Sequence, residues 1–216
     1  MSLKLFFMNI HDFWLFAFAA LMLNITPGND MLFVITRSAG QGVKAGIVCS
    51  LGIMVGCMVH IIAAVIGLSA IIASSAVAFD IIKYVGAAYL IYLGIKSLVS
   101  KRRSFEIDST IQQLPYKKLF WQGVITNVLN PKVALFFLAF LPQFIDMRPG
   151  ASRGQILFLG IWFDISGTIV NILVALLFGK IGNWLSHSPR FIQWQERFTG
   201  AILIALGIKV ALSSRK

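Results

Sequence analysis

Long apolar segments dominate this chain and restrict it to folds that a lipid bilayer can hold. Of its 216 residues, 58% are hydrophobic and 12% are charged, and the mean hydropathy is +0.83. This pattern predicts an all-α integral membrane protein. Six segments are long enough to cross ~30 Å of hydrocarbon at ~1.5 Å per residue. We expect the spans at residues 13–36, 45–69, 79–99, 119–142, 154–179 and 192–213.

The third and sixth segments are the weakest of these predicted spans. Their charge-free cores are short, so they cross only if flanking basic residues extend their charged groups to the interfaces. These residues are Lys83, Lys96, Arg197 and Lys209. Five spans are therefore an alternative to six. The apolar N-terminal segment lacks a clear small-x-small cleavage site, so we interpret it as an uncleaved span, with a signal peptide as the alternative.

A polar stretch at residues 100–118 divides the chain into two similar halves, residues 1–99 and 119–216. Three features recur in the same order in both halves. The matched pairs are the prolines of TPGND (26–30) and NPKVA (130–134), LGIMVG (51–56) with LGIWFD (159–164), and YLGIK (92–96) with ALGIK (205–209). Because three spans per half is an odd number, the halves would cross the membrane in opposite directions, as inverted repeats do.

The basic residues favour a membrane topology over nucleic-acid binding. Lys and Arg outnumber Asp and Glu by 19 to 8, but they lie between apolar spans, where anionic lipid and topology explain them. In the six-span arrangement, the loops on one side carry 11 basic residues and the opposite face carries 7. The linker at 100–118 is therefore predicted to be cytoplasmic, with both termini outside.

Pro27 and Pro131 break the first and fourth spans. Neither residue can donate a backbone hydrogen bond, so the carbonyls of Leu23 and Asn127 lose their helical partner in a medium without water. We expect nearby polar side chains to replace it, namely those of Asn24, Thr26, Asn29, Asn127 and Asn130. Gly28 lets the backbone turn. The free amides of such a broken helix suit a carboxylate and its free carbonyls suit a cation, although kinks that serve packing alone are the alternative.

Four ionisable residues fall inside the spans, where each costs at least ~2.5 kcal/mol and so faces a cavity or a partner. They are Asp30, His60, Lys132 and Asp164. Asp164 shares one helical face with Gly160, Gly167 and Asn171, which predicts that this face meets protein or water. Lys132 is interpreted as the partner of Asp164 or Asp30, or as a residue that reaches the interface.

A second stripe of small residues runs along the second span. Its members are Ala45, Cys49, Gly52, Gly56 and His60. The Gly-x-x-x-Gly core predicts a close approach of another helix, and we interpret His60 first as a residue that hydrogen-bonds between helices. Cys49 and Cys57, eight residues apart in this segment, are expected to be buried free thiols.

The sequence shows no arrangement of nucleophile and base, no phosphate-binding loop and no metal-ligand spacing, so we predict neither an enzyme nor a cofactor. Two acids in the spans are also fewer than a cation exporter would need. A non-transport membrane subunit or enzyme, or an exporter of another small solute or cation, is the alternative to the function below.

Three motifs resemble the LysE/RhtB family of bacterial amino-acid exporters over essentially the whole chain. They are TPGND (26–30), GAAYLIYLGIK (86–96) and TNVLNPKVALFFLAFLPQF (126–144). The resemblance implies a multi-pass protein of the bacterial inner membrane that exports amino acids or close derivatives, driven by an ion gradient. The intramembrane Asp164 fits the family pattern, whereas Asn29 stands where the family commonly has proline.

We therefore expect antiport of a small zwitterionic amino acid against protons, in a lipid environment and without nucleic acid, and a homo-oligomer is left open. The substrate carboxylate would meet amides around Gly28 or Lys132, and its ammonium would meet Asp164 or Asp30. The predicted substrate-binding residues are Asn24, Thr26, Pro27, Gly28, Asn29, Asn127, Asn130, Pro131, Lys132 and Asn171. The predicted proton-coupling residues are Asp164, Asp30 and His60.

Overall fold

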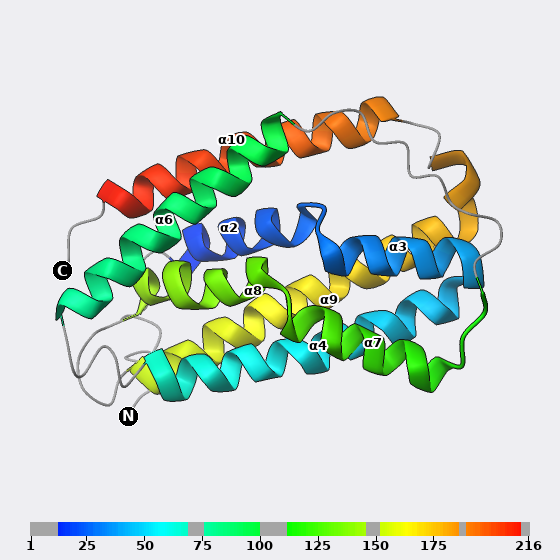
Figure 1. Ribbon diagram of the computed structural model, residues 1–216, viewed down its shortest axis with the longest axis horizontal. Helices are drawn as coiled ribbons and strands as arrows, with labels where there is room; N and C mark the ends of the chain where they lie inside the picture. Colours follow the sequence, from blue (N-terminus) through cyan, green and yellow to red (C-terminus); the bar gives the residue numbers. More distant parts are fainter. Residues whose placement is uncertain (1–12, 69–75, 100–111, 146–151, 186–188, 213–216) are drawn as a thin grey trace.

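The computed structural model describes residues 13–68, 76–99, 112–145, 152–185 and 189–212 (Figure 1). Within these ranges the chain is helical and contains no strand, as the sequence predicts. Most of the predicted cytoplasmic linker, residues 100–111, lies outside the described residues.

The first and fourth predicted spans are each broken where the sequence places a proline. The first consists of α2 (Phe13–Ile25) and α3 (Asn29–Gln41), which are bent by 50° at the break. The fourth begins with α7 (Tyr116–Val128) and bends by 43° before α8 (Pro131–Leu135). Beyond α8 the helix loosens into the π-helical turn η2 (Phe136–Phe140) and ends in the 3-10 turn η3 (Leu141–Phe144).

The other predicted spans correspond to longer helices. These are α4 (Val43–Ala63) with its π-helical extension η1 (Ala64–Leu68), α6 (Ala76–Leu98), α9 (Ser152–Leu185) and α10 (Pro189–Leu212). Among the described residues, two helical segments are long and apolar enough to cross a membrane alone, Val43–Gly67 and Arg153–Lys180, and counting each bent pair as one span gives four. In α6 and α10 the apolar stretches are shorter, so the number of spans depends on these two helices.

The helices run side by side along the long axis of the molecule (Figure 1). Helix α6 packs on α10, α4 packs on both α7 and α9, and α3 packs on α9. In Figure 1, α4 and α9 run in opposite directions, as do α6 and α10. Both breaks lie near the middle of the long axis (Figure 1), and α7 lies at the periphery, where Trp121, Ile125 and Leu129 are exposed.

Glycines set the contact between α6 and α10. A Cβ added to Gly94 would lie 2.6 Å from the carbonyl oxygen of Gly200, and one added to Gly207 would lie 2.9 Å from that of Ala87. Gly94 and Gly207 are the glycines of the two matched LGIK motifs, and a shift of 113 positions maps Gly94 onto Gly207 and Ala87 onto Gly200. The same contact is therefore made twice, with the roles of the two helices exchanged.

Glycines also bring α4 against α7. A Cβ added to Gly123 would lie 2.6 Å from the carbonyl oxygen of Cys49 and 3.2 Å from the Cα of Gly52. The close approach predicted from the Gly-x-x-x-Gly stripe is thus confirmed, with α7 as the partner. Cys49 and Cys57 are both buried and free, again as predicted.

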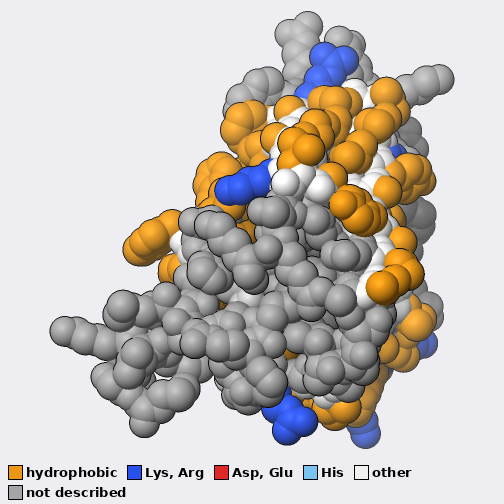
Figure 2. Space-filling view, turned by 90° about the vertical axis from the view of Figure 1, so that its left-hand side faces the viewer, with side chains coloured by type: hydrophobic (Ala, Val, Ile, Leu, Met, Phe, Trp, Pro, Cys, Tyr) orange, Lys and Arg blue, Asp and Glu red, His pale blue; other side chains and the backbone are white. Residues whose placement is uncertain are grey.

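Aromatic side chains fill the core at one end of the broken helices. The rings of Phe16, Phe136, Phe137, Phe140, Phe144 and Phe163 are in mutual contact and almost fully buried. Phe136 stacks on Phe163 with ring centroids 4.2 Å apart. The outer surface is apolar as well, and Figure 2 shows hydrophobic side chains over most of the described part of one face. A surface of this kind suits lipid and not water.

Candidate functional site

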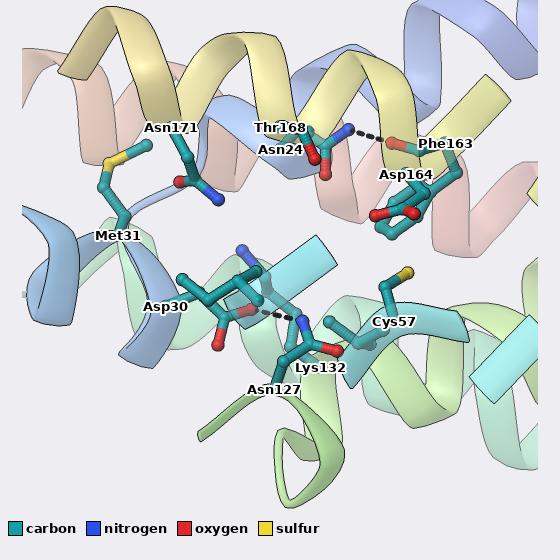
Figure 3. A pocket seen from close by; sticks show the side chains of 13 residues that line it. Asn24, Asp30, Met31, Cys57, Asn127, Lys132, Phe163, Asp164, Thr168 and Asn171 are labelled. Carbon is teal, nitrogen blue, oxygen red and sulfur yellow. Dashed lines mark hydrogen bonds between the residues drawn. The ribbon is translucent and has the colours of Figure 1, made fainter. Parts of the chain in front are cut away.

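A small cavity lies where the two helix breaks meet α4 and α9 (Figure 3). Its volume is about 40 Å³, which is room for only a few water molecules. Its polar lining residues are Asn24, Asp30, Asn127, Lys132, Asp164, Thr168 and Asn171. Its remaining lining residues are Met31, Ile53, Cys57, Val133, Phe163 and Gly167. The cavity thus combines both signs of charge with an apolar wall.

Lys132 satisfies the carbonyl end of α2. Its ammonium nitrogen Nζ donates to the carbonyl oxygens of Leu23 and Thr26, each at 3.0 Å. Pro27 cannot donate to the Leu23 carbonyl, which accepts from the backbone nitrogen of Thr26 at 3.2 Å as well as from Lys132. The prediction that a neighbouring Asn or Thr side chain replaces the missing donor is wrong, since the hydroxyl of Thr26 donates to Met22 instead. The side-chain partner comes from the other half of the chain.

His60 performs the matching role at the end of α7. Its Nε2 atom lies 2.9 Å from the carbonyl oxygen of Asn127, to which it donates when the ring carries its proton on that nitrogen. Pro131 cannot donate to this carbonyl, which also accepts from the backbone nitrogen of Asn130 at 2.9 Å. His60 therefore joins α4 to the break, which confirms its interpretation as a residue that hydrogen-bonds between helices.

Polar side chains connect the two breaks to each other. The amide nitrogen Nδ2 of Asn127 donates to Oδ2 of Asp30 at 2.8 Å. Asp30 lies in the first turn of α3, where its charge complements the positive end of the helix. Asn130 caps α8, with its Oδ1 accepting from the backbone nitrogen of Lys132 at 3.0 Å. One break thus supplies a cation and the other supplies an anion.

Asp164 lies on α9 and faces the cavity opposite Cys57 (Figure 3). Its side chain is only 3% exposed, and within the described residues its Oδ2 atom has no hydrogen-bond partner. Thr168 and Asn171, one and two helical turns further on, line the same cavity. The predicted inward-facing stripe of this helix is confirmed, and it presents a carboxylate oxygen that is available to a ligand.

Asn24 braces α2 against this part of α9. Its Nδ2 donates to the carbonyl oxygen of Phe163 at 3.1 Å and to the hydroxyl of Ser166 at 3.0 Å. A Cβ on Gly167 would lie 3.0 Å from the Asn24 side chain, so only a small residue fits there. The broken helix is therefore held one turn from Asp164.

The structure gathers about half of the predicted site residues around the cavity. Those that line it are Asn24, Asp30, Asn127, Lys132, Asp164 and Asn171. Thr26, Pro27, Gly28, Asn29, Asn130, Pro131 and His60 lie outside the lining and shape or support the breaks. Asn29 is exposed. Within the described ranges, no group of three or more His, Cys, Asp or Glu side chains is arranged to hold a metal ion.

Sequence reasoning missed most of the apolar wall. Met31, Ile53, Val133 and Phe163 are typical of any membrane span, and nothing in their pattern distinguishes a cavity-facing residue from one that faces lipid or the core. Thr168 had a usable signal, because it lies four residues after Asp164 and therefore on the same helical face.

Comparisons with known proteins identify the family. The model of the LysE type translocator family matches residues 21–214. The uncharacterized membrane protein YrhP of Bacillus subtilis is 34% identical over 203 residues, which cover 90% of this chain and 95% of the relative. An uncharacterized membrane protein of Vibrio cholerae is 30% identical over 205 residues, 94% of this chain and 98% of the relative.

The leucine efflux protein of Salmonella typhimurium is 34% identical over 136 residues, which cover 63% of this chain and 64% of that protein. No solved structure matches the chain. The helical, apolar architecture agrees with the membrane proteins found, and the family and its named relatives are transporters rather than enzymes. From the match over residues 21–214, this chain belongs to the LysE type translocator family.

Proposed function

We propose that this protein exports an amino acid with an apolar side chain across the bacterial inner membrane in exchange for protons. The observation that carries the proposal is the unpartnered carboxylate oxygen of Asp164, which faces a small cavity between two broken helices. Broken helices that meet at an interior site are the usual form of a substrate site in transporters built from inverted repeats.

The proposed architecture has six spans in two inverted halves, residues 1–99 and 119–216. The reciprocal contact of Gly94 and Gly207 supports it, as do the opposite directions of α4 and α9 (Figure 1). Helices α6 and α10 have 23 and 24 residues, and at ~1.5 Å per residue either is long enough to cross ~30 Å of hydrocarbon. Their basic residues would then reach the interfaces.

The chemistry of the cavity favours a zwitterion with an apolar side chain. Asp164 would bind the substrate ammonium, and the amides at the start of α3 or the Lys132 ammonium would bind its carboxylate. Met31, Ile53 and Val133 would contact the side chain. A leucine efflux protein among the relatives supports this substrate class. Because the cavity has room for only a few water molecules, it would have to widen to admit an amino acid.

Exchange would follow from competition for one carboxylate. A proton and a substrate ammonium cannot both neutralise Asp164, so binding of one favours release of the other. Asp30 is the alternative acid. Its Oδ2 atom accepts from Asn127, whereas its Oδ1 atom, like Oδ2 of Asp164, has no hydrogen-bond partner among the described residues, so the two acids are separated by experiment.

Purified protein in lipid vesicles, loaded with radiolabelled leucine, tests the proposal. Efflux should be faster with a pH gradient than without one, and lysine and glutamate should be transported poorly. Asp164→Asn preserves size and hydrogen bonding but removes the charge. We expect it to abolish the response to the gradient while permitting at most passive exchange.

Asp30→Asn is the matched variant, because it makes the same change to the other acid of the cavity. A response to the gradient that survives in Asp164→Asn and is lost in Asp30→Asn would move the coupling role to Asp30. Parent vesicles that release no amino acid of the panel would contradict export of amino acids altogether.

A further inference from the structure

The carbonyl end of α2 is built to hold a positive charge. The carbonyl oxygens of Leu23 and Thr26 converge on one point, which the Nζ atom of Lys132 occupies at 3.0 Å from each. Pro27 cannot donate to the Leu23 carbonyl, whose backbone partner is the Thr26 nitrogen at 3.2 Å, and the C-terminal end of a helix carries a partial negative charge. The two carbonyl oxygens that hold the ammonium therefore belong to the backbone, and the break after α2 fixes their positions.

The position of Lys132 between these two carbonyls is unusual, because its positive charge does not stabilise its own helix, α8. It lies in the first turn of α8, where a positive charge opposes the helix dipole. Its side chain crosses instead to the other half of the chain, 109 residues away in sequence. There it neutralises the carbonyl end of α2 and lines the same cavity as Asp30.

Gly28 provides the space for this crossing. Its backbone is extended, with φ of −155°, so its conformation does not require glycine. A Cβ at this position would lie 3.2 Å from Nζ and 3.5 Å from Cε of Lys132. The absence of a side chain at Gly28 therefore leaves room for the Lys132 side chain to reach the two carbonyls.

We propose that the carbonyl end of α2 is a binding site for a monovalent cation, and that the Lys132 ammonium fills it as a tethered replacement for a coupling Na⁺ or K⁺ ion. In transporters built from inverted repeats, carbonyls of this kind coordinate the coupling Na⁺ or proton. A chain that carries its own cation needs no metal ion at this point. As a statement about ion coupling, the proposal rests on the proposed export function, but the site itself can be tested without transport.

Removal of the tethered cation should create a requirement for a free one. In Lys132→Ala, the Leu23 and Thr26 carbonyls remain and the lysine side chain is gone. We expect the purified full-length variant to unfold at a lower temperature than the parent in choline chloride, whose cation is too large for the site. NaCl, KCl or ethylammonium chloride at equal concentration should raise that temperature by a few degrees in a saturable manner.

The parent protein and Lys118→Ala serve as controls. Lys118 is exposed in the first turn of α7, so its removal changes the net charge equally without touching the site. Both proteins should unfold at the same temperature in all four salts. Equal unfolding of Lys132→Ala in every salt would overturn the proposal, and so would a specific stabilisation of the parent by Na⁺ or K⁺.

If Lys132→Ala fails to fold in choline chloride, the variant is purified in each of the four salts and the yield of folded protein is compared. Recovery of folded protein only with the small cations supports the site, and equal loss in all salts overturns it. A transport measurement completes the test, since leucine efflux by the parent should not change when Na⁺ is replaced by choline. If the parent transports no amino acid, export is wrong, whereas the unfolding experiment still decides the cation site.

Discussion

The crossing of α4 and α7 gives the sharpest test of the packing, through the substitution Gly123→Ala. The added Cβ would lie 2.6 Å from the carbonyl oxygen of Cys49, and 3.2 Å from both the Gly52 Cα and the Ile53 nitrogen. Ordinary van der Waals contact begins at 3.4 Å, so the helices would have to separate by about 0.8 Å, the difference between 3.4 and 2.6 Å. All three obstructing atoms belong to the backbone, so no side-chain rotation relieves the contact.

The size of the effect follows from two opposing contributions. Overpacking against rigid atoms costs up to about 3 kcal/mol, while replacing glycine by alanine in a helix returns about 1 kcal/mol. A net loss of about 2 kcal/mol should lower the apparent unfolding temperature of a chain this long by about 4–8 °C. Thermal unfolding of the purified protein in detergent measures this shift. Leucine efflux should fall as well, because α7 carries Asn127 and α4 carries its partner His60.

Gly67→Ala is the matched control, because a Cβ at Gly67 would meet no atom within 4 Å in the described residues. We expect this variant to be as stable as the parent or slightly more stable. If Gly123→Ala behaves like Gly67→Ala, the two helices are not in backbone contact and the reasoning from Gly123 is wrong.

Three further predictions concern the breaks and the topology. His60→Phe keeps a ring beside Phe137 but removes one of the two donors to the Asn127 carbonyl, which retains the backbone nitrogen of Asn130 at 2.9 Å, and it should lower the free energy of unfolding by about 0.5–1.5 kcal/mol in thermal unfolding; unchanged stability would show that the His60 hydrogen bond does not contribute to folding. Pro27→Ala and Pro131→Ala should each abolish efflux while the protein remains inserted and folded, and normal efflux by both would reduce the breaks to packing features. Ser104→Cys, outside the described residues, should be inaccessible to an impermeant thiol reagent in whole cells and Ser214→Cys accessible, and the opposite pattern would invert the predicted topology.

The helical segments and both breaks could be predicted because their signals are local. An apolar run of sufficient length predicts a span, and a proline inside it removes a hydrogen bond wherever the rest of the chain lies. The inward direction of the Asp164 side chain could also be predicted, since Gly160, Gly167 and Asn171 share its helical face. The number of spans could not be predicted, because α6 and α10 have short apolar stretches bounded by basic residues.

The partner of Lys132 could not be predicted, and the reason is physical. The sequence offered Asp164, Asp30 or the membrane interface, all of which are side chains or solvent. The ammonium instead binds two backbone carbonyls. Every residue has a carbonyl, so only the relative placement of α2 and α8 identifies which two are available.

The contacts at the breaks also constrain how the proposed exporter would work. Lys132 belongs to the second half and binds the first, and Asp30 belongs to the first half and receives a hydrogen bond from Asn127 of the second. If the halves rock against each other, both contacts cross the moving interface, and opening would separate the Lys132 ammonium and the Asp30 carboxylate from these partners. A zwitterionic amino acid carries charges complementary to both groups, with a carboxylate for Lys132 and an ammonium for an acid of the cavity. Under the proposed function, the substrate would therefore compensate the charged groups that opening exposes, which ties the opening of the cavity to its occupation.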